Sequence, residues 1–150
     1  MIAVIQRTKT AKVIIGEKIK SEIGKGLLIL LGITHDDTDE DIDWLTNKIV
    51  NLRIFDDENG VMNKSVIEIG GDIITVSQFT LFARTKKGNR PSYIDAAKPE
   101  IAIPLYKSFI ENLDILLSKK TFSGEFGADM KVDLCNDGPV TIIIDTKNKK

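Results

Sequence analysis

Cysteine and histidine are almost absent from the chain, which has one of each, Cys135 and His35, among its 150 residues. A single cysteine cannot form an internal disulfide, and this is typical of proteins from a reducing compartment. Cysteine clusters and metal sites with two or more histidines are excluded. A Ser-His-Asp or Cys-His arrangement would have to use His35, which we expect to be an exposed loop residue.

Glycine-rich phosphate-binding motifs are also missing, because no P-loop occurs and no G-x-G-x-x-G follows an expected strand. The acidic run HDDTDEDID (35–43) lacks the spacing and the closing glutamate of a calcium loop. The start of a helix, where the dipole favours acidic residues, explains this run better. We therefore expect neither a metal ion nor a cofactor.

An excess of charge and a long apolar run are lacking too. Lys and Arg number 21 against 22 Asp and Glu, so the net charge of −1 gives no global attraction to nucleic acid or to an anionic membrane. The longest apolar run, Leu27 to Leu31, is far too short to cross a bilayer. Residues 1–15 lack the pattern of a signal peptide. These features predict a cytoplasmic protein with no membrane partner.

The length and the 42% of hydrophobic residues predict one domain over residues 1–150, with 146–150 as a frayed tail. Strand-like patterns occur at 1–7, 12–15, 17–23, 25–34, 66–69, 72–82, 122–134 and 140–145. Strands outnumber helices without alternating strictly with them. The expected class is α+β, with a mixed, largely antiparallel or barrel-like sheet and two main helices.

The two helices are predicted from caps and periodicity. Asp36, Asp37 and Thr38 offer N-cap oxygens to the first helix. Its apolar face is expected to consist of Ile42, Leu45, Ile49 and Leu52. A second amphipathic helix is expected from about Pro99 to Leu117, although Pro104 removes one backbone donor.

Polar residues interrupt an otherwise apolar strand in VSQFTL (76–81). In a strand, Ser77 and Phe79 would face one side, and Gln78 and Thr80 the other. Either one face of the strand is exposed to solvent or its polar side chains bond to neighbouring backbone, or the strand ends in a small polar site. The Thr80 hydroxyl could be a nucleophile only with a base nearby, and no obvious base exists in this sequence.

Three further segments allow two interpretations each. The basic loop 84–93 is either a solvated hairpin or a phosphate contact through Lys86, Lys87 and Arg90. Residues 122–130 (FSGEFGADM) form either a bulged strand or a backbone left bare for a close ligand. Residues 136–139 either turn the chain into a strand that begins near the proline, or take part in chemistry.

Several of these segments together resemble one family. They are VIQRT (4–8), SQFTL (77–81), KGNRPSY (87–93), GEFGADM (124–130) and NDGPVT (136–141). In this order, and spanning nearly the whole chain, they resemble D-aminoacyl-tRNA deacylase. SQFTL and NDGPVT are specific as a pair, whereas either alone would be a weak signal.

The resemblance implies hydrolysis of the ester that joins a D-amino acid to the 3′ end of tRNA. It also implies a homodimer in which Gly138-Pro139, joined by a cis peptide bond, enters the partner's pocket. The two carbonyls would capture the substrate amino group and exclude L-side chains. Ser77 to Thr80 would line the pocket, the backbone N–H of Phe79 would bind the scissile carbonyl, and Arg7 would hold the Gly-Pro element.

The resemblance further assigns Ala128 and Met130 to substrate binding and Lys86, Lys87 and Arg90 to tRNA contact. It implies that the terminal 2′-hydroxyl of the tRNA takes part in the reaction, with Thr80 as nucleophile in an older view. Glycyl-tRNA should also be accepted, because glycine has no side chain to reject. Two alternatives remain open: a non-catalytic tRNA-binding module, and a hydrolase of the same fold for glycyl- or small L-aminoacyl-tRNA.

Overall fold

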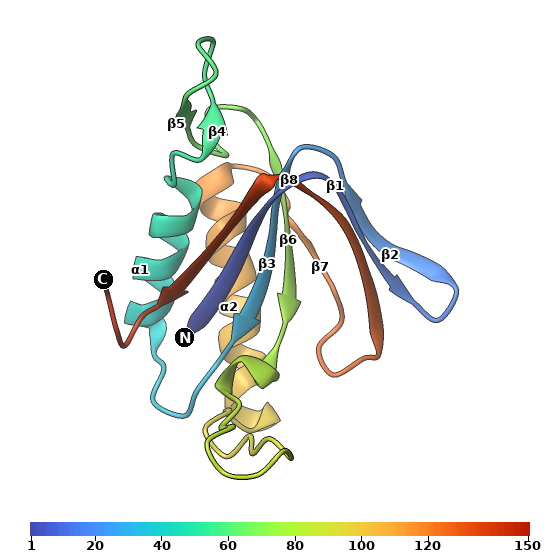
Figure 1. The fold of residues 1–150 in the computed structure, drawn as a ribbon, viewed down its shortest axis with the longest axis vertical. Coiled ribbons are helices and arrows are strands. Elements are labelled where there is room, and N and C mark those ends of the chain that lie inside the picture. Colours follow the sequence, from blue (N-terminus) through green and yellow to red (C-terminus); the bar gives the residue numbers. More distant parts are fainter.

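A long first strand organises the computed structural model, which describes residues 1–150. The elements in chain order are β1 (Ile2–Ile15), β2 (Lys18–Ile23), β3 (Gly26–Gly32), α1 (Asp39–Val50), β4 (Phe55–Asp56), β5 (Met62–Lys64), β6 (Asp72–Ser77), the 3-10 helix η1 (Phe79–Phe82), α2 (Pro99–Leu117), β7 (Phe122–Ser123) and β8 (Met130–Asp145). Figure 1 shows both α-helices on one face of the main sheet. Neither helix is long and apolar enough to span a lipid bilayer.

The main sheet is mixed and curls toward a closed barrel. Its strand order is β2-β1-β3-β6-β7, and β8 pairs with β1. The three pairings of β1 are antiparallel, whereas β3–β6 and β6–β7 are parallel. The ends of the sheet meet where the Ser21 hydroxyl of β2 donates to the Ser123 carbonyl of β7 at 2.6 Å. The predicted α+β class with a barrel-like mixed sheet is confirmed.

Both helices begin where their sequences predict, whereas Leu52, expected on the apolar face of the first helix, lies beyond the end of α1 at Val50. Thr38 caps α1 in a capping box with Asp41, and the Thr38 N–H donates to the Asp41 carboxylate at 2.9 Å. Partial burial raises the pKa of Asp41, but contacts with Lys147, Thr146 and the Thr38 backbone outweigh it and hold this pKa far below its usual range. Helix α2 begins at Pro99, a first-turn position that needs no N–H donor. The buried residues of the two helices are Ile42, Leu45, Thr46, Ile49 and Val50 in α1, and Ala102, Tyr106, Phe109 and Leu113 in α2.

The strands contribute to two hydrophobic clusters on opposite faces. Alternate residues of β3 and β6, such as Leu27 and Ile73, pack against the helices. Their neighbours Leu28 and Ile74 fill the interior of the curled sheet together with Val13. Because one cluster covers each face of β3, nearly all of its side chains are buried.

Several predicted strand boundaries were wrong. The predicted strands 1–7 and 12–15 form one continuous strand, because β1 pairs with β8 along nearly its whole length. Residues 66–69 form a turn, not a strand. The strand predicted over 72–82 ends at Ser77 and gives way to η1. The small β4–β5 hairpin was not predicted.

The C-terminal part of the chain also differs from expectation. The 122–134 strand is interrupted after Ser123, and β8 begins only at Met130. Strand β8 then continues through residues 136–139 instead of starting at the proline. The tail is held at its start, since Thr146 is buried and its N–H donates to the Met1 carbonyl at 2.9 Å. The expected fraying is therefore wrong for Thr146.

A buried ion pair joins the two ends of the chain to the start of α1. The α-amino group of Met1 lies 2.5 Å from the Asp37 carboxylate, and both side chains are fully buried. The same amino group donates to the Thr146 hydroxyl at 2.7 Å. Asp37 also accepts from the Thr34 N–H at 2.8 Å. Removing one partner of a buried pair leaves the other charge uncompensated.

Asp37→Asn should therefore lower the free energy of unfolding by about 3–5 kcal/mol. The exposed neighbour Asp36, whose side chain forms no hydrogen bond, provides the control substitution Asp36→Asn. Urea denaturation of untagged protein measures both changes. Equal, small effects of the two substitutions would contradict a structural role for the pair.

Candidate active site

The end of β6 creates an exposed turn. The Gln78 N–H donates to the Leu31 carbonyl at 2.8 Å, and η1 begins at the next residue. The predicted strand alternation over 76–81 is therefore wrong beyond Ser77. The chain leaves the sheet, and the Phe79 side chain is 56% exposed.

A cavity of about 160 Å³ lies beside this turn. The ends of β3 and β6, the first turn of α2 and the segment 126–130 surround it. Its lining consists of Leu31, Ile33, Ser77, Gln78, Phe79, Ala97, Ala102, Phe126, Gly127, Ala128 and Met130. The structure thus brings together five predicted site residues: Ser77, Gln78, Phe79, Ala128 and Met130.

No ionisable side chain lines this cavity, and only Ser77 and Gln78 contribute polar side chains. Thr80 lies outside the lining. Its hydroxyl accepts a hydrogen bond from the Gln78 side-chain amide at 2.5 Å. Nothing in this arrangement can deprotonate Thr80. No group of three or more His, Cys, Asp or Glu side chains is positioned to hold a metal ion.

Backbone donors are available at the cavity edge. Phe79 and Thr80 occupy the first two positions of η1, and the first N–H groups of a helix have no intrahelical acceptor. The next N–H, that of Leu81, donates to the Gln78 carbonyl at 3.2 Å. The cavity edge therefore offers N–H groups in place of titratable side chains.

The segment 124–130 approaches the cavity with little side-chain bulk. A Cβ atom on Gly124 would lie 2.4 Å from the Met130 sulfur, so a side chain there would displace Met130. Gly127 has a φ of +79°, which favours glycine. The structure contradicts a bulged strand here. The interpretation of a backbone left bare for a close ligand stays a prediction, since the space at Gly124 is taken by the Met130 side chain.

Sequence reasoning missed the apolar walls and floor of the cavity. Phe126 packs edge-on against Tyr106, with ring centroids 5.7 Å apart. The Tyr106 hydroxyl donates to the Thr75 carbonyl at 2.8 Å, and burial raises the pKa of Tyr106 to about 12. Tyr106 is therefore a neutral, structural residue at ordinary pH. Such residues have the pattern of a hydrophobic core, which gave no functional signal.

A bulge in β8 contains the Gly-Pro motif. Between the pairs Thr8–Asn136 and Gln6–Thr141, β1 advances two residues while β8 advances five. The Asn136 side chain closes this bulge by accepting from the Val140 N–H at 2.8 Å and donating to the Thr141 hydroxyl at 2.9 Å.

Inside the bulge, the Gly138-Pro139 peptide is cis, which confirms the predicted geometry. Gly138 has a φ of +136°, a conformation that L side chains rarely adopt.

Arg7 supports the bulge from β1. This nearly buried guanidinium donates to the Asp137 carbonyl at 2.8 Å and to the Ile54 carbonyl at 2.6 Å. Asp56 lies 3.4 Å away and supplies a carboxylate. Arg7 therefore connects the bulge to the chain that follows α1.

The bulge and the cavity lie at opposite ends of the sheet. Along the strands, the bulge lies beside Gly26 at the start of β3 and Asp72 at the start of β6. The cavity begins beside Leu31 and Ser77, near the ends of the same two strands. These levels differ by five residues, or about 16 Å along a strand at roughly 3.3 Å per residue. In Figure 1, β8 bends at the top of the sheet, whereas η1 lies at the bottom.

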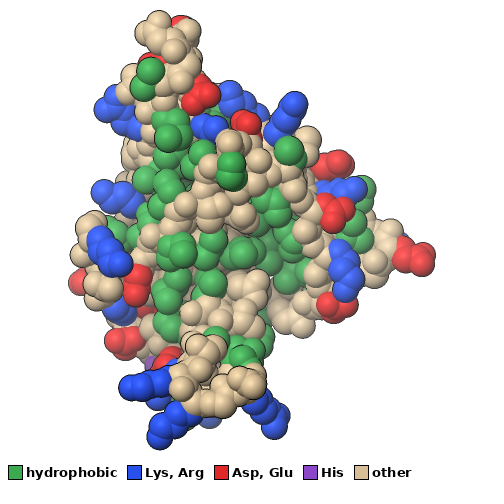
Figure 2. Space-filling model, in the orientation of Figure 1, with side chains coloured by type: hydrophobic (Ala, Val, Ile, Leu, Met, Phe, Trp, Pro, Cys, Tyr) green, Lys and Arg blue, Asp and Glu red, His purple; other side chains and the backbone are tan.

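The basic loop extends beyond the cavity end of the sheet. Arg84 and Ser92 close it with two backbone hydrogen bonds, of 2.8 and 3.1 Å. Lys86, Lys87 and Arg90 are exposed and form no ion pair. Figure 2 shows Lys and Arg side chains gathered at this lower end of the molecule.

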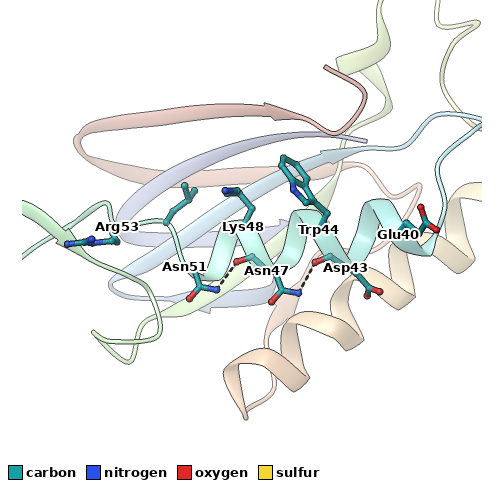
Figure 3. A pocket seen from close by; sticks show the side chains of 8 residues that line it. Glu40, Asp43, Trp44, Asn47, Lys48, Asn51 and Arg53 are labelled. Carbon is teal, nitrogen blue, oxygen red and sulfur yellow. Dashed lines mark hydrogen bonds between the residues drawn. The ribbon is translucent and has the colours of Figure 1, made fainter. Parts of the chain in front are cut away.

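A larger surface depression follows the outer face of α1 (Figure 3). Its amide side chains bond to the helix itself: Asn47 donates to the Asp43 carbonyl at 2.8 Å, and Asn51 to the Asn47 carbonyl at 2.9 Å. The Trp44 ring is covered by Lys149, whose ammonium lies 4.3 Å from the ring centroid. Because its amides are already bonded to the helix and its tryptophan is covered, this depression is a weaker candidate than the cavity.

The fold and the cavity together define an α+β domain whose site offers backbone groups instead of titratable side chains. The family model described as D-Tyr-tRNA(Tyr) deacylase matches residues 4–145. Proteins named D-aminoacyl-tRNA deacylase from Parabacteroides distasonis and Flavobacterium psychrophilum are 64% and 65% identical to this chain, with both chains covered completely in each comparison. The chain belongs to the D-Tyr-tRNA(Tyr) deacylase family.

Solved structures agree with this fold. One described as "c-Myc DNA Unwinding Element Binding Protein" is 42% identical, with a TM-score of 0.90 over 97% of this chain and 98% of the other. A second, described as a probable eukaryotic D-amino acid tRNA deacylase, is 16% identical, with a TM-score of 0.84 over 95% and 97%. The second likeness concerns the fold alone.

Proposed function

We propose that this chain hydrolyses the ester bond of D-aminoacyl-tRNA in the cavity at the end of β6, and so releases the D-amino acid and free tRNA. The observation that carries the proposal is the cavity itself, which combines unpaired backbone donors with a lining free of ionisable side chains. The occurrence of this cavity in a member of the D-Tyr-tRNA(Tyr) deacylase family supports the substrate class.

The mechanism rests on electrostatic stabilisation. The Phe79 N–H binds the scissile carbonyl and stabilises the oxyanion that develops when the ester is attacked. Ser77 and Gln78 line the cavity and position the ester and a water molecule. The terminal 2′-hydroxyl of the tRNA participates in the reaction. Thr80 is not the nucleophile, because its hydroxyl accepts from Gln78 and has no base beside it.

Chiral selection requires a second copy of the chain. Gly138-Pro139 lies at the end of the sheet opposite its own cavity, so it completes the cavity of a partner. There the two carbonyls accept from the substrate amino group and exclude an L side chain, while Arg7 holds the bulge in place. Glycine has no side chain to exclude, so glycyl-tRNA is also a substrate.

An apolar sheet face supports this homodimer. Val4, Leu30 and Ile143 form a row across three adjacent strands on the face away from the helices, and Ile143 is 69% exposed. Figure 2 shows hydrophobic side chains spread over the front of the molecule. Exposed apolar patches of this kind mark contact surfaces. An isologous dimer with C2 symmetry would form both cavities together.

The basic loop holds the tRNA. Lys86, Lys87 and Arg90 lie at the cavity end of the molecule, where they contact backbone phosphates while the 3′ end enters the cavity. Such contacts position a nucleic acid without reading its sequence. The net charge of −1 means that this attraction is local.

Purified protein should deacylate D-Tyr-tRNA well above the spontaneous rate and leave L-Tyr-tRNA largely intact. A chelator should not abolish the activity, because no metal participates. Acid-gel or thin-layer separation of charged and free tRNA gives the rates, and Gly-tRNA and L-Ala-tRNA complete the series. Binding of tRNA without turnover would contradict the proposal and indicate a binding module. Preference for L-Ala-tRNA would indicate another editing hydrolase.

Thr80→Ala should retain substantial activity, because backbone donors and the substrate hydroxyl carry the reaction. The unaltered enzyme should hydrolyse a D-aminoacyl-tRNA that ends in 2′-deoxyadenosine more slowly than Thr80→Ala hydrolyses the ordinary substrate. Single-turnover kinetics on both substrates separates the two effects. Loss of nearly all activity in Thr80→Ala, together with a covalent intermediate in the unaltered enzyme, would restore Thr80 as nucleophile.

Mixing two inactive variants should recover activity if the cavity is completed by a partner. Ala128→Trp blocks the cavity, and Gly138→Ala distorts the bulge because its Cβ would lie 2.9 Å from the Val140 side chain. In an equal mixture, half of the re-formed dimers contain one copy of each variant. Such a mixed dimer has one intact cavity out of two, so about a quarter of full activity should return.

Sedimentation of the same samples checks that mixed dimers form. Mixed dimers without recovered activity would exclude a shared cavity, and so would a fully active monomer of the unaltered chain.

A further inference from the structure

An exposed aromatic pair lies between the cavity and the basic loop. Phe79 is 56% exposed and Tyr93 is 39% exposed. Their rings meet edge to face, with centroids 5.0 Å apart and an interplanar angle of 78°. By contrast, Phe55 and Phe109 are fully buried. An exposed pair adds apolar area to the surface without adding to the core, so it suggests a binding role.

The pair is held on a rigid backbone. Phe79 begins η1 directly after the last hydrogen bond of β6. The Tyr93 carbonyl accepts from the Ala96 N–H at 3.0 Å, and the Thr34 hydroxyl donates to the Asp95 carbonyl at 2.6 Å. A platform fixed before binding loses little conformational entropy when a ligand docks on it.

The charges beside the pair identify its ligand. The one carboxylate in the 84–95 segment, Asp95, is engaged by Arg84 at 2.6 Å. Lys86, Lys87 and Arg90 form no ion pair and remain available to an anion. Exposed aromatic rings next to unpaired cations are the arrangement that binds single-stranded nucleic acid, in which bases stack on the rings and phosphates meet the cations.

We propose that Phe79 and Tyr93 form a stacking platform for the single-stranded nucleotides that precede the terminal adenosine of the tRNA. This inference rests on the proposed function, because the platform is useful only if the aminoacylated adenosine enters the cavity that Phe79 lines. Tyr93 receives the penultimate base on its exposed face. Phe79 supports the Tyr93 ring from the side and separates the stacked strand from the cavity.

The platform adds a specificity that the phosphate contacts lack. Stacking is tolerant of base identity but requires an unpaired base, so the platform favours a free 3′ end over a duplex. The enzyme would thereby recognise the single-stranded end common to all tRNA without reading their sequences.

The test compares substrates with and without the penultimate base. Three D-tyrosyl substrates are used: an acceptor-stem minihelix, the same minihelix with an abasic penultimate nucleotide, and D-tyrosyl-adenosine. Tyr93→Ala should raise KM for the intact minihelix by about fivefold to tenfold more than for D-tyrosyl-adenosine, with kcat little changed. For the abasic minihelix, Tyr93→Ala should raise KM much less than for the intact one. Tyr93→Phe should behave as the unaltered chain.

Lys87→Ala provides the matched control. It removes a phosphate contact, so it should weaken the intact and the abasic minihelix equally and reduce the salt dependence of binding. If Tyr93→Ala raised KM equally for all three substrates, the proposal would be overturned, because the residue would then only shape the cavity. An equal loss on the intact and abasic minihelices would likewise exclude stacking.

Two further measurements keep the outcomes distinct. If the unaltered chain hydrolyses none of the three D-tyrosyl substrates, the proposed function fails. Equilibrium binding of an uncharged minihelix and its abasic form still tests the platform, and equal affinities would overturn it. A shift of Tyr93→Ala to a monomer in sedimentation would show that the pair lies between two copies of the chain, which also overturns the proposal.

Discussion

The continuity of β1 is the constraint on which the rest of the structure depends. Along its N-terminal half β1 pairs with β3 on one edge and β8 on the other, and along its C-terminal half with β2 and β8. Its registers therefore fix both the cavity end of the sheet and the bulge end. A hydrogen-bonded sheet does not shorten, so the roughly 16 Å between these ends is a fixed property of one copy.

Local signals in the sequence were sufficient for the helices and insufficient for the strand ends. Thr38 and Pro99 mark helix starts through contacts within a few residues, so both helices were predictable. The end of β6 is decided by a distant partner instead. Apolar residues continue through Phe82, but the chain leaves the sheet where β3 ends at Gly32, at which a Cβ would meet the Leu81 side chain at 3.1 Å.

The site was predictable where motifs carry polar or glycine-rich residues, and not where its walls resemble a core. Ser77 and Gln78 stand out in an apolar run, whereas Ala102 and Phe126 have the pattern of ordinary packing residues. Thr80 shows the converse, since it belongs to the motif but lies outside the cavity lining, and its role stays a prediction. Motifs identify the segment that forms a site, and the backbone path decides which members of the segment face it.

Backbone groups suit the selection between mirror images that we propose for this site. A side chain can rotate to accommodate either enantiomer, but an N–H at a strand end and carbonyls in a closed bulge are fixed by the hydrogen bonds around them. The same rigidity reduces the need for ionisable residues in the proposed reaction, because donors that are already oriented do not reorganise as the oxyanion forms. Under the proposed function, this rigidity also links activity to assembly. If the filter is rigid and lies far from its own cavity, the sheet of one copy can present it only to another.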